Sequence, residues 1–144
     1  TIMKSPLIAV MHPTHALANR DSLSIKDLSG FPMINFSPQA NPITSDFNKQ
    51  IFKKAGAQLN IVREIPNIET AAFCASINEG VFIMPEYLLS SIGSLRTVPL
   101  TDSFAYVTLN LIWKKKNPNI SIPVFVDSFS TYIQNRNPNL APAD

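Results

Sequence analysis

Three patterns in this sequence predict an α/β fold. Residues 7–11 form a short, continuous apolar run, which is typical of a strand buried on both faces. Residues 43–55 place an apolar side chain at every fourth position, which indicates an amphipathic helix. Residues 106–113 alternate apolar and polar side chains, which indicates a strand between two different environments. Strands that alternate with helices favour a sheet that is mostly parallel within its strand-helix units.

Local signals bound the first elements after the opening strand. Ser24 and Asp27 fit a capping box and Gly30 fits a helix stop, so residues 24–29 are expected to form one or two helical turns. Residues 31–36 form a second short apolar strand, and the polar loop 37–40 follows it.

The helix expected from 42 to 55 has the clearest ends. Asn41 is a good N-cap, Pro42 suits the first helical position, and Gly56 lies just past the end. Its apolar stripe comprises Ile43, Phe47, Ile51 and Ala55. Phe52 lies beside Ile51 and either widens this stripe toward the core or faces a partner.

A second strand-helix unit follows. Residues 59–65 read as a strand that Pro66 ends, and Asn67 can cap a helix. Asn78 is expected to stop that helix in the left-handed conformation. The face it would bury comprises Ile68, Ala71, Ala72 and Ala75.

The remaining elements are expected to be short, apart from a closing helix. They are a buried strand at 81–84, a helix opened by Pro85 and ending near 91, an extended piece at 97–99, and a helix that starts near Pro123. The tail from Asn135 is rich in Asn and Pro and is expected to fray.

Composition limits the possible functions. A chain of 144 residues is about one domain, and its 45% hydrophobic and 15% charged residues are typical of a globular protein. A net charge of +2, with no evident basic face, argues against nucleic-acid binding by charge alone. No apolar run is long enough for a membrane helix and the start lacks the features of a signal peptide, so we expect a cytoplasmic protein. The chain begins without Met close to its first strand and is expected to be a piece of a longer protein.

Reactive side chains do not form a catalytic or metal-binding pattern. His12 and His15 have no carboxylate nearby and are interpreted as part of a turn. Cys74, the one cysteine, excludes an internal disulfide and is interpreted as a buried structural thiol. Arg63 and its neighbour Glu64 would face opposite sides of a strand, and the lysines at 114–116 are interpreted as a solvated strand end. We expect no enzyme activity, no cofactor and no metal.

Two helix N-termini are the candidate binding positions. Each follows the C-terminal end of an expected strand, where open α/β sheets bind ligands, and each offers free N–H groups and a helix dipole to an anion. Ordinary helix capping is the alternative interpretation, and Glu69 would satisfy the dipole at the second helix. The candidate residues are Ser37, Gln39 and Asn41 at the first helix, and Pro66, Asn67 and Thr70 at the second.

Four segments in order carry a resemblance to a known family. They are residues 6–18 (PLIAVMHPTHALA), 27–34 (DLSGFPMI), 80–86 (GVFIMPE) and 111–117 (LIWKKKN). Their succession resembles the later part of the effector-binding domain of LysR-type transcriptional regulators, over about residues 5–135. The family usually has Gly-x-Gly where this chain has Asn78 and Gly80, and a small residue where it has Phe82.

The resemblance implies a type II periplasmic-binding-protein-like fold with two subdomains. Residues 1–11 would be a crossing strand with a remnant of the first subdomain, and 12–105 the second subdomain. Residues 106–135 would be the returning crossing strand and closing helix, and 136–144 a frayed tail. The effector pocket would lie between the subdomains, with the six candidate residues on its second side.

The resemblance therefore implies a ligand-sensing domain of a bacterial DNA-binding transcription regulator. Its expected partners are a small polar effector such as an organic acid, DNA through a separate N-terminal winged helix, and a second copy of the chain. In the family the helix at 42–55 packs on a partner chain, and Phe52 is the residue expected to do so here. A solute-binding protein of the same fold is the alternative, and a transferase or dehydratase of that fold ranks third.

Overall fold

The computed structural model describes residues 3–114, 116 and 118–136 of the chain. The chain divides into two units. One is Pro6–Tyr106, and the other combines Thr1–Ser5 with Val107–Asp144. The first strand, β1 (Met3–Met11), contributes to both.

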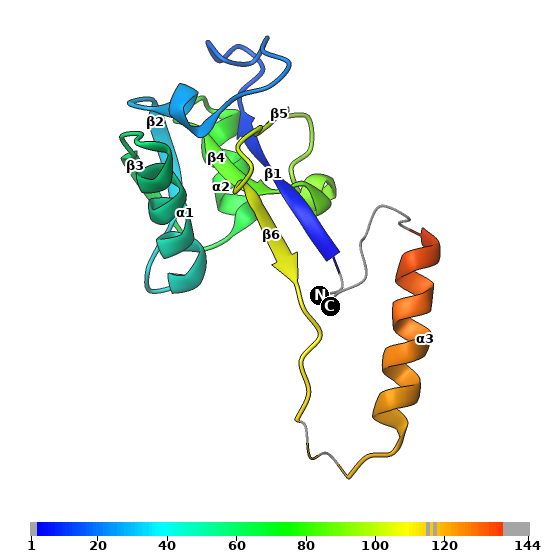
Figure 1. Ribbon diagram of the computed structural model, residues 1–144. Helices are drawn as coiled ribbons and strands as arrows, with labels where there is room; N and C mark the ends of the chain where they lie inside the picture. The colour runs from blue at the N-terminus through cyan, green and yellow to red at the C-terminus, as the bar shows by residue number, and fades with distance from the viewer. Residues whose placement is uncertain (1–2, 115, 117, 137–144) are drawn as a thin grey trace. The chain divides into compact units, whose positions relative to one another are not determined.

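β1 is the central strand of an antiparallel group. It pairs on one side with β4 (Phe82–Pro85) and on the other with β5 (Arg96–Pro99), and both neighbours run antiparallel to it (Figure 1). Every residue from 7 to 11 is buried, which confirms the strand predicted there. A continuous apolar sequence is needed because side chains on both faces of β1 are covered.

β2 (Pro32–Phe36) and β3 (Asn60–Ile65) form a parallel pair, with Phe36 opposite Ile65. An isolated parallel bridge between Met33 and Val81 connects β2 to the start of β4. The close approach of β2 to Val81 requires a glycine at position 80, because a Cβ on Gly80 would lie 2.7 Å from the carbonyl oxygen of Pro32. The mixed α/β architecture predicted from the sequence is confirmed.

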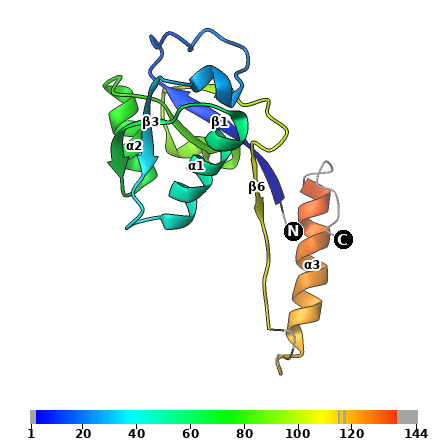
Figure 2. The ribbon, with the colours of Figure 1, turned by 60° about the vertical axis from the view of Figure 1, so that its left-hand side comes forward.

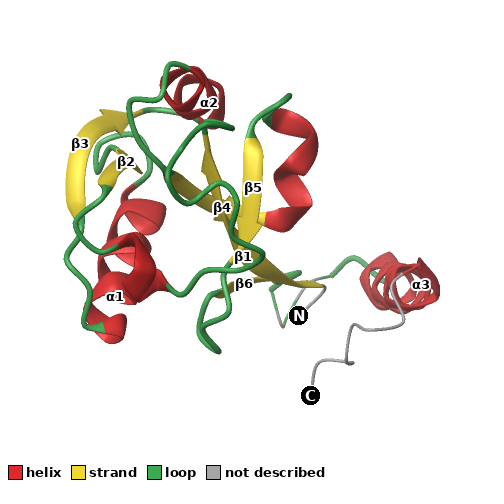
Figure 3. Cartoon of the chain, turned by 90° about the horizontal axis from the view of Figure 1, so that it is seen from above, coloured by secondary structure: helices red, strands yellow, loops and turns green. Residues whose placement is uncertain are grey.

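Two helices cover opposite faces of the parallel pair. α1 (Pro42–Ala55) lies on one side and α2 (Ile68–Ser76) on the other, as Figures 2 and 3 show. Consecutive side chains of β2 alternate between them. Ile34 and Phe36 join a core cluster that includes the buried residues of α2, whereas the side chain of Asn35 bonds to residues of α1.

The predicted helix ends are confirmed, because they depend on local chemistry. Asn41 and Asn67 cap the two helices with their side-chain oxygens, and α1 begins with Pro42. Gly56 ends α1 at φ +65°, in the left-handed region that glycine adopts without strain. Asn78 has φ +57°, as predicted for the stop after α2.

The predicted apolar stripe of α1 is partly wrong. Ile43 is 83% exposed, while the buried face consists of Ser45, Asn48, Ile51 and Phe52. A spacing of four residues drifts by about 40° per step around a helix with 3.6 residues per turn, so the first member of the stripe leaves the buried face. Phe52 is 1% exposed within this chain, so the expectation that it faces a partner chain is also wrong.

The turn before β2, η1 (Ile25–Leu28), is a 3₁₀ helix with the predicted capping box. The Asp27 N–H donates to Ser24 Oγ at 3.2 Å, and the Ser24 N–H donates to Asp27 Oδ2 at 2.8 Å. Arg20 lies 3.8 Å from the same carboxylate oxygen. The hydrogen bond from the Ser24 N–H is the main reason that the pKa of Asp27 lies below its ordinary value.

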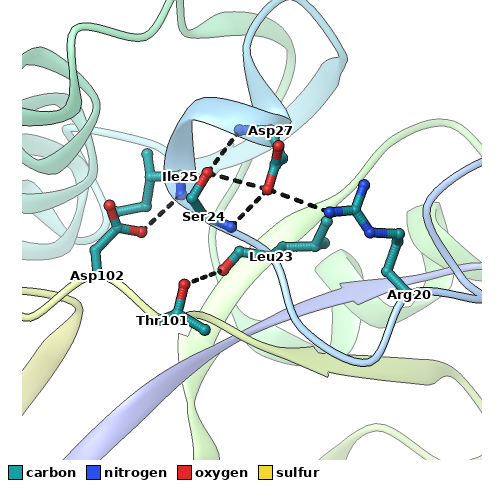
Figure 4. A network of polar contacts seen from close by, with 7 residues as sticks. All are labelled: Arg20, Leu23, Ser24, Ile25, Asp27, Thr101 and Asp102. Atoms are coloured by element: carbon teal, nitrogen blue, oxygen red, sulfur yellow. Dashed lines mark hydrogen bonds and ion pairs between the residues drawn. The ribbon is translucent and has the colours of Figure 1, made fainter.

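The chain after β5 holds η1 in place (Figure 4). The Ile25 N–H donates to Asp102 Oδ2 at 2.7 Å. The Thr101 N–H donates to the Leu23 carbonyl oxygen at 2.9 Å, and the Thr101 hydroxyl donates to the same oxygen at 3.3 Å. Segments about 78 residues apart in the sequence are thus bonded through both backbone and side chains.

The later elements differ from the prediction in their lengths. The helix opened by Pro85 is a 3₁₀ turn, η2 (Glu86–Ser91). β6 (Tyr106–Leu109) pairs with β1 and ends before Trp113, where the predicted strand ended.

The closing helix, α3 (Ser121–Arg136), includes Asn135, where fraying was predicted. Residues 137–144 of the predicted tail lie outside the described residues. Within the described part of the chain, no helix is both long and apolar enough to cross a membrane.

Candidate functional site

The two predicted loops start side by side. β2 and β3 run parallel and end opposite each other, so the loops 37–41 and 66–70 leave the same edge of the sheet. The Ser37 N–H donates to the Ile65 carbonyl oxygen at 2.9 Å and joins their bases. The structure therefore brings the two halves of the predicted site together at their bases.

The first loop uses most of its polar groups internally. Ser37 Oγ accepts from the Ala40 N–H at 3.1 Å, and the Ser37 carbonyl oxygen accepts from the Asn41 N–H at 2.9 Å. Asn41 Oδ1 accepts from the Thr44 N–H at 3.1 Å and caps α1. Gln39 is exposed, and no hydrogen bond of its side chain is found among the described residues. This loop is therefore a compact turn with one free amide side chain.

The second loop is capped in the same way. Asn67 Oδ1 accepts from the Thr70 N–H at 2.9 Å and from the Thr70 hydroxyl at 2.8 Å. Pro66 has no N–H to donate and fixes the backbone before the cap. The N–H groups of Ile68 and Glu69 have no acceptor within their own helix, because they belong to its first turn.

Capping leaves hydrogen-bond donors at both helix N-termini. The caps use the Oδ1 atoms of Asn41 and Asn67, and neither Nδ2 group has a partner in the described ranges. Neither loop contains lysine or arginine, and Glu69 adds a negative charge at the second. The arrangement can donate hydrogen bonds to a carboxylate, carbonyl or hydroxyl oxygen but brings no positive side chain to it.

The region around Cys74 is structural. Cys74 is buried on α2, and Arg63 forms an ion pair with Glu79, whose Oε1 accepts from Arg63 Nε at 2.8 Å. Burial is the main cause that raises the pKa of the Cys74 thiol, and its hydrogen bond to Glu79 adds to the effect. The guanidinium of Arg63 holds the pKa of Glu79 below its usual range. A thiol with a raised pKa is a poor nucleophile at neutral pH, which agrees with the interpretation from the sequence.

The two histidines order a turn after β1. His12 Nδ1 lies 2.7 Å from the Thr14 hydroxyl, and His15 Nδ1 accepts from the Leu17 N–H at 3.2 Å. The described residues contain no group of three or more side chains that could hold a metal ion. Of the lysine run, Lys114 and Lys116 are exposed, and the residue between them lies outside the described residues.

A buried polar cluster below the first loop was not predicted from the sequence. It consists of Asn35 on β2 and of Ser45 and Asn48 on α1. The available signal was a polar residue inside an otherwise apolar strand, at a position facing the helix that follows. Polar residues in such buried strands usually need a partner across the layer.

Comparison with known proteins gives a consistent result. The family model described as "LysR substrate binding domain" matches residues 1–132. The uncharacterized HTH-type transcriptional regulator YwbI of Bacillus subtilis (strain 168) is 27% identical over 117 residues, which are 80% of this chain and 38% of that protein. The chain therefore spans about two fifths of the length of this relative.

Solved structures show the same fold. The match to the effector-binding domain of a BenM variant covers 99% of this chain and 67% of the BenM chain, with a TM-score of 0.82 at 19% identity. The BenM effector-binding domain with its effector benzoate covers 98% of this chain and 64% of its own with a TM-score of 0.76 at 18% identity. The match to the effector-binding domain of QuiR in complex with shikimate covers 93% of this chain and 64% of the QuiR chain. Its TM-score is 0.70 at 19% identity.

Proposed function

Because the chain belongs to the LysR substrate-binding domain family, we propose that it senses a small organic acid for a DNA-binding transcription regulator. The observation that carries the proposal is the pair of capped helix N-termini joined by the bond from the Ser37 N–H to the Ile65 carbonyl oxygen. Family membership favours a regulator over a solute-binding protein of similar fold. The buried thiol and the absence of a catalytic pattern in the sequence support sensing rather than catalysis.

The proposed effector site uses the two loops as one wall. Gln39 and the Nδ2 groups of Asn41 and Asn67 would donate hydrogen bonds to the effector. The Thr70 hydroxyl, which donates its own hydrogen to Asn67, can still accept a hydrogen bond from the effector. Ser37 and Pro66 would fix the loop shapes. The effectors of the structural neighbours support an acid, because benzoate and shikimate both carry a carboxylate. Since the loops hold no cationic side chain, the charge of the effector would be balanced by other parts of the protein.

The proposed domain organisation follows the family. Residues 12–105 form the second subdomain, and 1–11 and 106–135 connect it to a first subdomain that makes the other wall of the cleft. Residues 136–144 form the tail. DNA is bound by a separate N-terminal winged helix, and the protein acts in the cytoplasm as a homo-oligomer. Phe52 has no part in that assembly, because it is buried in its own chain.

A thermal-shift screen of organic acids on the full-length regulator tests this proposal, with benzoate and shikimate in the panel. A hit should stabilise the wild type and stabilise the Gln39→Ala and Thr70→Ala variants less, because each loses a side chain of the wall. Thr70→Ser keeps the hydroxyl and should respond like the wild type. Gln50→Ala, on the exposed side of α1, is the matched control for Gln39→Ala. A hit whose stabilisation is undiminished in both alanine variants would locate the site elsewhere.

A further inference from the structure

Three polar side chains are buried between β2 and α1. Asn35 is 1% exposed, Ser45 is 0% exposed and Asn48 is 6% exposed. Burying amides and hydroxyls is unfavourable unless their hydrogen bonds are made. Within the described residues, no buried side-chain nitrogen or oxygen lacks a hydrogen-bond partner.

Asn35 connects two successive turns of α1. Its Oδ1 accepts from Asn48 Nδ2 at 2.8 Å, and its Nδ2 donates to Ser45 Oγ at 3.4 Å. An apolar side chain would fill this space without a directional requirement. Buried polar groups of this kind are best known for fixing the register of packed elements. A shift of α1 along β2 by one turn would break both bonds.

The two halves of α1 are held by different forces. The half next to the loop is bonded through Ser45 and Asn48, whereas the far half packs through Ile51 and Phe52. Hydrogen bonds fix distance and direction, whereas apolar packing tolerates small displacements more readily. The directional contacts are therefore concentrated at the end of α1 that carries the loop 37–41.

The second loop has no comparable cluster among the described residues. The buried face of α2 consists of Ala71, Cys74 and Ala75, which pack into the apolar core. α1 and α2 follow parallel strands and are capped alike, so the polar cluster is the feature that distinguishes the first loop from the second.

We infer that Asn35 is a positioning residue that fixes the register of α1 on β2 and so sets the placement of Gln39 and Asn41 in the effector site. Asn35 lies two residues before Ser37, and Ser45 lies four residues after Asn41, so the cluster closes the base of the loop from both sides. The inference deepens the proposed function and rests on it for the identity of the site, whereas its structural part can be measured without an effector.

Hydrogen–deuterium exchange on the full-length protein tests the inference. The variant is Asn35→Leu combined with Ser45→Ala and Asn48→Leu, because replacing a whole buried polar cluster by apolar groups of similar shape preserves stability in many proteins. Its melting temperature should stay within a few degrees of the wild type. Amide exchange in residues 37–44 should accelerate by about tenfold, because the loop and the first turn of α1 would open more often once hydrogen bonds no longer fix α1 on β2. Exchange in residues 66–71 should stay at the wild-type rate.

Val98→Ala is the matched control for a general loss of stability, because Val98 is buried on β5 and takes no part in the cluster. It should accelerate both loops alike. Equal acceleration of both loops in the triple variant, or none in residues 37–44, would overturn the inference. Should the triple variant fail to fold, Ser45→Ala alone gives the deciding measurement, with Ser45→Thr expected to restore slow exchange. A separate benzoate titration tests the ligand class, and its failure would not alter the exchange result.

Discussion

The unit Pro6–Tyr106 and the segment after it differ in how far their apolar side chains are buried. In the first, β1, β4 and the end of α1 bury theirs almost completely. In the second, α3 keeps large apolar side chains exposed, among them Val124, Phe125 and Tyr132. Both segments are apolar in sequence, so hydrophobicity alone does not tell which residues are covered within this chain.

The difference indicates that the described residues cover the apolar side chains of β1 and β4 but leave those of α3 uncovered. The chain corresponds to 67% of the BenM variant domain that it matches. We expect the remaining part of a complete effector domain to cover the apolar side chains of α3.

The largest effect is expected for Phe52→Ala in the first unit. Truncating a fully buried Phe removes apolar contacts and leaves a cavity, which lowers the free energy of unfolding by about 3–5 kcal/mol. Ile43→Ala on the same helix is the control and should change stability by less than about 0.5 kcal/mol, because Ile43 is exposed. Urea denaturation of both variants measures the difference. Similar losses would mean that the buried face of α1 has been assigned wrongly.

A smaller effect is expected for Gly80→Ala. The added Cβ would meet the backbone of Pro32, so β2 and β4 would have to separate, at a cost of about 1–3 kcal/mol. Gly56→Ala offers a comparison, because its Cβ would meet nothing within 4 Å and only the left-handed φ opposes it. That strain costs about 1 kcal/mol. Equal denaturation midpoints for wild type and Gly80→Ala would show that the junction of β2 and β4 is looser than described.

The ends of the main elements could be predicted from the sequence because their signals are local. Asn41, Pro42 and Gly56 bound α1 through interactions within a few residues, so no tertiary information is needed. The length of β6 could not be predicted in this way. The length of a strand also depends on its pairing with a neighbouring strand, which the alternation of residues beyond Leu109 does not reveal.

The candidate site was predictable in its position and only partly in its chemistry. Strand ends followed by helix caps identify the loops, because parallel strands end at one edge of a sheet. The role of each side chain depends on its distances to neighbouring groups, which the sequence does not give. The Oδ1 atoms of Asn41 and Asn67 accept the capping bonds, so their Nδ2 groups are the ones left to bind a ligand. The cluster of Asn35, Ser45 and Asn48 was missed because its members are brought together only by the packing of α1 on β2.

The pH dependence of stability should also report on the first unit, because both histidines of the chain lie within it. Burial lowers the pKa of His15 below 6.5, so the folded state binds fewer protons than the unfolded state as the pH falls through that value. The stability contributed by neutral His15 is complete above the unfolded pKa and is lost as the pH falls toward the folded one.

Urea denaturation from pH 7.5 to 5.5 measures this loss. His15→Asn keeps a hydrogen-bond acceptor for the Leu17 N–H but does not titrate, so its stability should depend less on pH in this range. A wild type and variant with parallel pH profiles would contradict the role assigned to His15.

The smallest effect is expected for Phe125→Ala on α3, and it separates the two regions most directly. Phe125 is 55% exposed and stacks on Phe129 at a centroid distance of 5.5 Å, so the 144-residue chain should lose less than about 0.5 kcal/mol. In the full-length protein, where we expect the first subdomain to cover α3, the same substitution should cost about 1–3 kcal/mol. Denaturation of both proteins under the same conditions gives the comparison. A loss that is equally small in both would mean that α3 remains uncovered in the complete protein, so that its exposed apolar side chains are a property of the whole protein.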